Sequence, residues 1–402
     1  MDREELALRN NKLTDAFHAL AAQYYIRRVL LYLVGYTPIM QQKPIENERI
    51  LLIRPDHVGD MLLTTPAIHA LRVARPNAEI HMLVGAWSGN VLANYPDVDA
   101  ILTLPFPAFT RSIKRDWLAP YRLVLKSARQ LRKIGYSSAV ILRPDHWWGG
   151  MLAHLAGIPE RIGYNFADVA PFLTDKIPHR HQHAIIQSMR LVERWTGKIA
   201  TEDIDFTFHI NDADRGYVNG YLQEWDIKPQ KPIFCIHPGS GTWVKLWETG
   251  RWAAVADTLI EQLDASVVFT GGNHELLMTH EIVSQMKNPA CIAVSDTDLG
   301  QLAALFARAR VVIGPDSGPL HLASAVGTPT VTLFGPADSV EFGPWGPEKK
   351  HIVLTGDIDC RPCRVLDWGN DKPEFHPCVR EISIGQVLEA ARIAAQTKGN
   401  EF

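Results

Sequence analysis

Short, continuous apolar runs recur along the first half of the chain, and each ends at a polar or glycine-containing turn. Segments with helical spacing of apolar residues lie between them, at about 60–74 and 112–134. Strands that are apolar on both faces and alternate with helices are typical of a parallel α/β sheet. The expected strands of this half are 49–55, 78–85, 100–105 and 137–144.

The alternation restarts after "EWDIKPQKP" (224–232), a polar, proline-containing stretch that we interpret as a linker. We therefore expect a second doubly wound sheet and four parts: a helical extension (1–47), a first domain (48–224), a second domain (225–382) and a C-terminal helix (383–402) that packs back toward the first domain. The expected strands of the second half are 233–239, 265–272, 291–294, 311–314 and 330–335. Its expected helices are 248–263, 274–286, 298–308 and 319–326.

Composition supports two domains and excludes some partners. A chain of 402 residues is longer than one hydrophobic core usually serves. The net charge of −3 gives no overall attraction to nucleic acid, and five cysteines do not form a secreted disulfide framework. The start "MDREELALRNN" is too polar for a signal peptide, and no apolar run is long enough to cross a bilayer. A cytoplasmic location is expected.

The segment 13–34 has apolar residues at helical spacing, with Tyr24, Tyr25, Arg27 and Arg28 near its middle. One interpretation is a helix that packs on the body of the protein. The other is an interfacial helix on the inner face of the cytoplasmic membrane, where aromatic and basic residues are common. The pattern alone leaves both open.

The tetrapeptide "RPDH" occurs at 54–57 and again at 143–146, each time just after an expected strand. Strand carboxyl ends face the ligand crevice of an open α/β sheet, so both loops are expected on the same side of the domain. Chance similarity of two loops is the alternative.

The loop after the first strand carries more polar groups than a helix cap requires. Gly59 permits a tight turn and Asp60 stands near the start of the next helix, where a lone Asp is usually an N-cap. Arg54, Asp56 and His57 lie beside it in the sequence. A functional carboxylate is therefore the competing interpretation.

Three glycine-rich turns follow strands in the second half: "HPGSGTWVK" (237–245), "GG" (271–272) and "GPDSGPLH" (314–321). Such turns can present backbone N–H groups to an anion, and Lys245 adds a positive charge. Neither a P-loop nor a GxGxxG fingerprint occurs in the sequence, which disfavours P-loop kinase chemistry and nicotinamide or flavin binding. The turns suggest a ligand with a nucleotide diphosphate.

Four segments together resemble the bacterial heptosyltransferases of glycosyltransferase family 9. They are "IRPDHVGDMLLTTPAIHALR" (53–72), "HLAGIPERIGYN" (154–165), "HPGSGTWVKLWETGRWAAV" (237–255) and "VVIGPDSGPLHLASAVGTPTVTLFGP" (311–336). The resemblance covers about 48–382 and implies the GT-B architecture, with two Rossmann-like domains facing each other across a cleft. It also implies inverting transfer of a sugar, typically heptose from ADP-heptose, to lipopolysaccharide inner core or a related lipid-linked glycan.

The resemblance assigns the acceptor to the first domain and the nucleotide-sugar donor to the second. The family's catalytic acidic residue maps onto Asp60, which would accept the proton of the attacking hydroxyl. The expected donor-binding residues are Ser240, Gly241, Thr242, Lys245, Gly271, Gly272, Asp316, Ser317, Gly318 and His321. The expected acceptor-binding residues are Arg54, His57, Gly59, Arg143, His146 and His183. No cofactor and no divalent metal are expected.

Several features fall outside this scheme. The extension 1–47 and the aromatic and basic stretch 106–122 depart from the family pattern. "CRPC" (360–363), His376 and Cys378 suggest a buried thiol cluster more than a Zn²⁺ site, and "HRHQH" (179–183) suggests an exposed or acceptor-facing loop more than a metal site. A sugar-nucleotide epimerase of the same architecture and a catalytically silent glycan-binding protein are the alternative functions.

Overall fold

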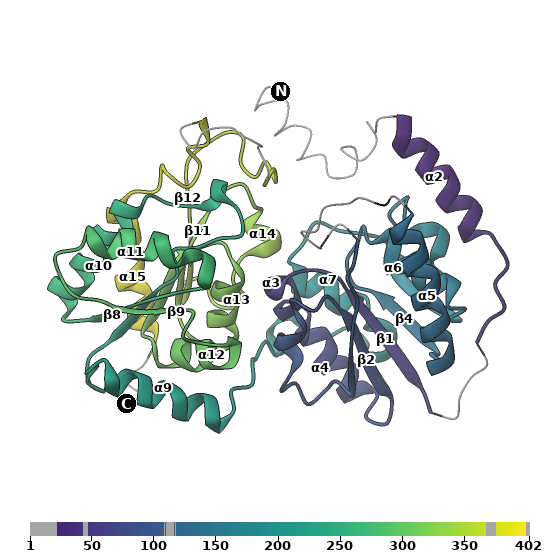
Figure 1. Cartoon of the computed structure of the whole chain (residues 1–402), viewed down its shortest axis with the longest axis horizontal. Coiled ribbons are helices and arrows are strands. Elements are labelled where there is room, and N and C mark those ends of the chain that lie inside the picture. The colour runs from purple at the N-terminus through teal and green to yellow at the C-terminus, as the bar shows by residue number, and fades with distance from the viewer. Residues whose placement is uncertain are drawn as a thin grey trace. The chain divides into compact units, whose positions relative to one another are not determined.

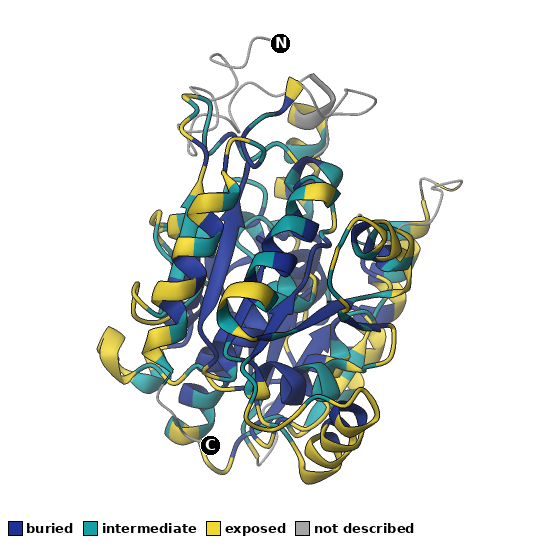
Figure 2. Ribbon diagram, turned by 90° about the vertical axis from the view of Figure 1, so that its left-hand side faces the viewer, coloured by how far each residue is buried: buried dark blue, intermediate teal, exposed yellow. Residues whose placement is uncertain are grey.

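The computed structural model describes residues 22–42, 47–107, 109, 116, 118–366 and 375–398. It contains two compact units, an N-terminal one that ends at Phe206 and a C-terminal one that begins at Thr207 (Figure 1). Each unit has its own six-stranded parallel sheet, and the central strands are buried between helices with exposed outer faces (Figure 2). In the described part of the chain no helix combines the length and apolarity needed to cross a membrane.

The N-terminal sheet has the strand order β3-β2-β1-β4-β5-β6, with all neighbours parallel. This is the doubly wound order, in which the chain reverses direction across the sheet between its first and fourth strands. The strands are β1 (Arg49–Arg54), β2 (Glu79–Val84), β3 (Ala100–Thr103), β4 (Ser138–Ile141), β5 (Glu160–Tyr164) and β6 (Asp175–Ile177). The longer helices are α2 (Ala22–Gly35), α4 (Thr65–Ala74), α5 (Ala119–Ile134), α6 (Trp147–Leu155) and α7 (Ala184–Arg190).

The expected helix at 60–74 is two helices, α3 (Val58–Leu62) and α4. Pro66 stands in the first turn of α4, where a missing N–H costs little, but it cannot continue a preceding helix. The hydroxyl of Thr64 donates to the carbonyl of Asp60, and that of Thr65 to the carbonyl of Leu62. The break therefore lets α3 form a separate short turn that carries Asp60.

The C-terminal sheet repeats the same order, β12-β11-β10-β7-β8-β9, again all parallel. Its strands are β7 (Ile233–Ile236), β8 (Ser266–Gly271), β9 (Cys291–Val294), β10 (Val311–Pro315), β11 (Thr330–Phe334) and β12 (His351–Thr355). Its longer helices are α9 (Asp212–Glu224), α10 (Thr249–Leu263), α11 (Leu276–Ser284), α12 (Leu299–Arg308), α13 (Gly318–Ala325) and α15 (Ile384–Thr397). The two doubly wound sheets agree with the predicted fold class.

The structure places the boundary between the units earlier than the proline-containing linker suggested. Helix α9 packs against α12, and the Tyr221 hydroxyl donates to the carbonyl of Ile292 at 3.0 Å. The boundary is therefore Phe206/Thr207 rather than 224/225, and "EWDIKPQKP" begins at the end of α9 and leads into β7. A polar stretch in the sequence indicates a surface turn. It does not indicate which of the two units the preceding helix packs against.

The C-terminal helix also differs from its expected place. The buried face of α15 packs on β10, β11 and β12 and against α10, so it belongs to the core of the C-terminal unit. The expectation that it packs back toward the first domain is wrong. The apolar periodicity of an amphipathic helix predicts that one face is buried, but it does not predict which surface that face packs against.

Candidate active site

The two "RPDH" loops meet at the carboxyl ends of the adjacent strands β1 and β4. In the first copy Arg54 Nε lies 2.8 Å from Asp56 Oδ2, and in the second Arg143 Nε donates to Asp145 Oδ1 at 2.6 Å. The loops also cross, since Arg143 Nη1 donates to Asp56 Oδ1 and Arg54 Nη1 donates to the carbonyl of Leu142. The prediction that both loops lie on one side of the domain is confirmed.

Asp60 lies in the first turn of α3 beside this charge network. Its carboxylate is 32% exposed, and its Oδ1 is 3.6 Å from Arg54 Nη2. Partial burial and the negative charge of Asp56 raise the pKa of Asp60, while Arg54 and Arg143 oppose the shift. The N-cap of α3 is His57, so Asp60 does not hold the cap position that the structural interpretation required.

The other expected acceptor residues of this unit have different surroundings. His57 is exposed and faces the ring of Trp87, with a centroid separation of 6.1 Å. His146 is buried beside Phe106, and burial lowers its pKa to about 4, so its ring is neutral at pH 7. His183 caps α7, where its Nδ1 accepts from the backbone of Ile185.

Gly59 is the second residue of α3, between the cap and Asp60. Arg143 completes the acceptor-side group, with its guanidinium 5.2 Å from the ring centroid of Phe109. The expected acceptor residues Arg54, His57, Gly59 and Arg143 therefore belong to the loops and turn around Asp60, and the structure gives His183 a capping role.

In the C-terminal unit most of the expected donor residues follow β7 or β10, which are neighbours at the same reversal point of the strand order, whereas Gly271 and Gly272 lie at the end of β8. Lys245 Nζ lies 2.5 Å from Asp316 Oδ2, and both side chains are largely buried. An ammonium group has three protons to donate, so Lys245 can hold Asp316 and still meet a second anion. The ion pair joins the loop after β7 to the loop after β10.

The third glycine-rich turn leads into α13, which begins at Gly318 with Ser317 as its N-cap. The Ser317 hydroxyl donates to the carbonyl of Pro315 at 3.1 Å, so it does not cap the helix itself. Pro319 has no N–H and the Leu320 N–H donates to the carbonyl of Ser317, so Gly318 supplies the N–H at the start of α13 that could meet an anion. His321 is buried one turn further along α13.

The first two turns share Glu275, a residue that the sequence analysis missed. Glu275 is buried, and its Oε2 accepts from the backbone of Gly272 at 2.6 Å. A Cβ placed at Gly239 would lie 1.6 Å from Glu275 Oε1, so this carboxylate requires glycine there. The N–H of Gly272 therefore donates to the Glu275 carboxylate within the protein. The turn Ser240–Gly241–Thr242 is held by a different bond, in which the Thr242 hydroxyl donates to the carbonyl of Leu366.

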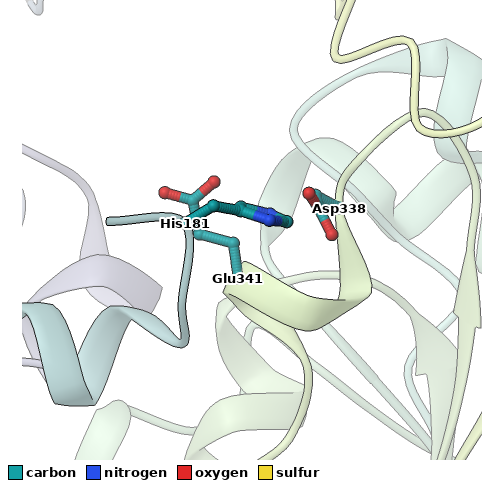
Figure 3. A group of neighbouring side chains, drawn as sticks. All are labelled: His181, Asp338 and Glu341. Carbon is teal, nitrogen blue, oxygen red and sulfur yellow. The ribbon is translucent and has the colours of Figure 1, made fainter. Parts of the chain in front are cut away.

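A second missed group lies around the short helix α14 (Ser339–Phe342), shown in Figure 3. Asp338 caps this helix through Val340 N, and Glu341 projects from it. Arg364 pairs with Asp338 and lies 3.7 Å from Glu341. The sequence analysis noted the neighbouring thiols and overlooked this arginine, whose partners lie 23 to 26 positions earlier. His181, also labelled in Figure 3, belongs to the N-terminal unit.

The expected thiol cluster is partly buried. Cys363 and Cys378 are buried and Cys360 is intermediate, and none of the three forms a disulfide. Burial, with the neighbouring Cys363 and Cys360, raises the pKa of Cys378 to about 11, so its thiol is protonated at pH 7. The segment 367–374 between the two ends of this cluster lies outside the described residues.

Residues 124–370, more than half of the chain, match glycosyltransferase family 9 (heptosyltransferase). The chain belongs to glycosyltransferase family 9. This family 9 chain is 23% identical over 361 residues to lipopolysaccharide heptosyltransferase 2 of Escherichia coli (strain K12), a match that covers 85% of the chain and 97% of the relative.

Two solved structures support the GT-B fold of this family 9 protein. A family 9 glycosyltransferase from Veillonella parvula has a TM-score of 0.73 and 24% identity, covering 89% of this chain and all of the other. The E. coli ADP-heptose lipopolysaccharide heptosyltransferase II has a TM-score of 0.68 and 21% identity, covering 87% and 99%. At 24% and 21% sequence identity, the similarity to these two structures shows a shared fold.

Proposed function

We propose that this family 9 glycosyltransferase transfers heptose from ADP-heptose to a lipopolysaccharide-core or related lipid-linked acceptor, with inversion at the anomeric carbon. The observation that carries the proposal is Asp60, a partly buried carboxylate with a raised pKa at the carboxyl end of the first sheet. A base with a pKa shifted toward neutrality suits proton abstraction from a hydroxyl. The names of the relatives support heptose and ADP-heptose as substrates.

In the proposed reaction the acceptor hydroxyl attacks the anomeric carbon as the nucleotide diphosphate leaves from the opposite face. The transition state has oxocarbenium character, as in glycoside hydrolysis. Asp60 accepts the hydroxyl proton. Lys245 and the N–H groups of 239–242, Ser317 and Gly318 stabilise the charge that develops on the leaving diphosphate. This assignment uses no divalent metal, so transfer is expected to persist in EDTA.

Donor identity is tested first by thermal shift with ADP, UDP and GDP and their sugar conjugates. ADP and ADP-heptose are expected to raise the melting temperature most. Transfer is then measured with lipopolysaccharide that lacks heptose, and the anomeric configuration of the product is read by NMR. Conversion of the nucleotide sugar without acceptor would identify the epimerase, and binding without any product would identify a glycan-binding protein.

We further propose that α2 holds the enzyme at the inner face of the cytoplasmic membrane. One face of α2 packs on the N-terminal unit: Leu31 is buried, and Arg27 and Arg28 each lie 2.6 Å from Asp168. This agrees with the packed-helix interpretation for residues 22–35, and 13–21 lie outside the described residues. The opposite face exposes an apolar row: Tyr25, Ile26, Val29, Leu30 and Leu33.

A row of positive charge on α5 favours an anionic surface as the partner of this face. Arg122, Lys126, Arg129 and Lys133 are exposed and recur at helical spacing. Helices α2 and α5 both pack on α6, and they lie on the same side of the N-terminal unit in Figure 1. Each basic residue near an anionic bilayer contributes about 1 kcal/mol. The apolar row and the basic row together suit anionic phospholipid.

Replacing Ile26 and Leu33 by Glu is expected to reduce flotation with phosphatidylglycerol vesicles by at least about tenfold, because each buried apolar side chain contributes roughly 1.5–3 kcal/mol. Both residues are 64% exposed, so the fold should tolerate the change. The matched control is Val73→Glu with Leu277→Glu, at positions 68% and 84% exposed outside α2. Equal flotation of both variants would contradict the membrane role. Deleting 1–40 is a harsher test, because it also removes Leu31 from the core.

A further inference from the structure

The charged groups around Asp60 include more carboxylates than guanidinium groups. The guanidinium groups are those of Arg54 and Arg143, and the three carboxylates are Asp56, Asp60 and Asp145. The short contacts go to Asp56, which meets both guanidinium groups, and to Asp145. Asp60 is left with a single 3.6 Å contact to Arg54. It is the carboxylate of this group without a close ion-pair partner.

Asp56 stands between the two loops and is only 2% exposed. Its Oδ2 faces Arg54 of its own loop, and its Oδ1 accepts from Arg143 of the other loop. Burying a carboxylate costs several kcal/mol unless it is paired, and Asp56 has two cationic partners. Its position therefore fixes the direction in which both guanidinium groups point.

We propose that Asp56 and Arg143 are positioning residues: Asp56 occupies both guanidinium groups, so that the Asp60 carboxylate stays free of a tight ion pair and accepts the proton of the acceptor hydroxyl. This inference rests on the proposed role of Asp60 as base. A carboxylate held in a bidentate contact with arginine is a weak base, because the ion pair stabilises its charged form. The arrangement thus keeps Asp60 reactive although two arginines lie nearby.

The electrostatics agree with the geometry. The groups that act on Asp60 are Asp56, Arg54 and His57 from its own loop and Arg143 from the loop after β4. Burial and Asp56 raise the pKa of Asp60, and Arg54, Arg143 and His57 lower it. Removing Asp56 deletes a like charge and also releases both arginines toward Asp60. Removing Arg143 deletes a cation and leaves Asp56 in place. The two substitutions should therefore move the titration of Asp60 in opposite directions.

The test is a titration of the Asp60 carboxyl by ¹³C NMR in protein labelled at Asp, with the signal assigned by its loss in Asp60→Asn. Asp56→Asn is expected to move the midpoint to lower pH than in the wild type, and Arg143→Gln to higher pH. A role in folding alone would lower the melting temperature of both variants without opposite shifts. Unchanged midpoints, or shifts of the same sign, would overturn the proposal. If Asp56→Asn does not fold, an upward shift in Arg143→Gln supports the proposal and its absence refutes it.

Asp145→Asn is the matched control. It makes the same chemical change in the second copy of the repeat, where the carboxylate is 41% exposed and contacts Arg143 but not Arg54. Its effect on the Asp60 midpoint is expected to be smaller than that of Asp56→Asn.

The turnover number for heptose transfer is an independent test of the positioning role of Asp56. Asp56→Asn is expected to lower kcat about 10- to 100-fold, the scale of a misplaced catalytic group, with ADP affinity unchanged. The acid limb of its pH profile should move to lower pH. A wild-type protein that transfers no heptose would defeat the proposed function, yet the carboxyl titration needs no substrate and would still decide the role of Asp56.

Discussion

Replacing Asp60 by Asn is expected to lower turnover by about 10²–10⁴-fold, the usual contribution of general acid–base catalysis. Asn is nearly isosteric and keeps a hydrogen-bonding side chain, but it cannot accept the proton. The fold should survive, because Asp60 is partly exposed and its one ion-pair contact, to Arg54, is 3.6 Å long. Nucleotide affinity should also survive, because the expected donor residues belong to the C-terminal unit.

The measurement is turnover with purified variant, after its melting temperature and ADP affinity have been checked against the wild type. In the wild type, turnover should fall as the pH drops through a midpoint above the ordinary Asp range, because the pKa of Asp60 is raised and the active form is deprotonated. Near-wild-type turnover of Asp60→Asn would show that another group accepts the proton.

Replacing Lys245 by Ala is expected to weaken ADP binding about 10- to 150-fold, because a charge-assisted contact contributes roughly 1.5–3 kcal/mol. The structure adds a second expected effect. Lys245 is 2.5 Å from Asp316, whose carboxylate is only 6% exposed, so the substitution leaves a buried charge without its partner. Breaking such a pair typically costs about 3–5 kcal/mol of unfolding free energy.

The double variant Lys245→Ala with Asp316→Asn separates the two effects. It removes the buried charge together with its partner, so the melting temperature should recover relative to Lys245→Ala. Affinity for ADP, measured by calorimetry, should stay low because the cation is still missing. Recovery of affinity together with stability would show that Lys245 acts only through the fold and does not meet the diphosphate.

The sequence predicted the central strands well because they are buried on both faces and carry little except apolar residues. β1, β7 and β10 begin at their expected first residues, and each ends at the turn that was singled out. β5 and β6 were not predicted, since "ERIGY" and "DKI" are short and charged. Such strands are fixed by their neighbours in the sheet more than by their own composition.

The sequence predicted individual residues of the candidate site but not the ion pairs that they form. Asp60, Lys245 and Asp316 were all named, whereas the contacts Lys245–Asp316 and Asp56–Arg143 join loops 71 and 87 positions apart. Those contacts depend on the strand order, which brings the first and fourth strands of each sheet together. Glu275 was missed for a related reason: in the sequence it is an ordinary acidic residue in a first helical turn, and its burial follows from the approach of Gly239.

The ion pair across the reversal point of each sheet has a consequence for the entropy of binding. In each unit, a positively charged side chain from one loop is fixed to a carboxylate from the neighbouring loop, Arg143 to Asp56 in one and Lys245 to Asp316 in the other. Ordering a rotamer-rich side chain at the moment of binding costs about 0.5–1.5 kcal/mol. Here that ordering is completed when each unit folds. The substrate then meets loops that are already in place, and its contacts contribute to affinity without first having to arrange them.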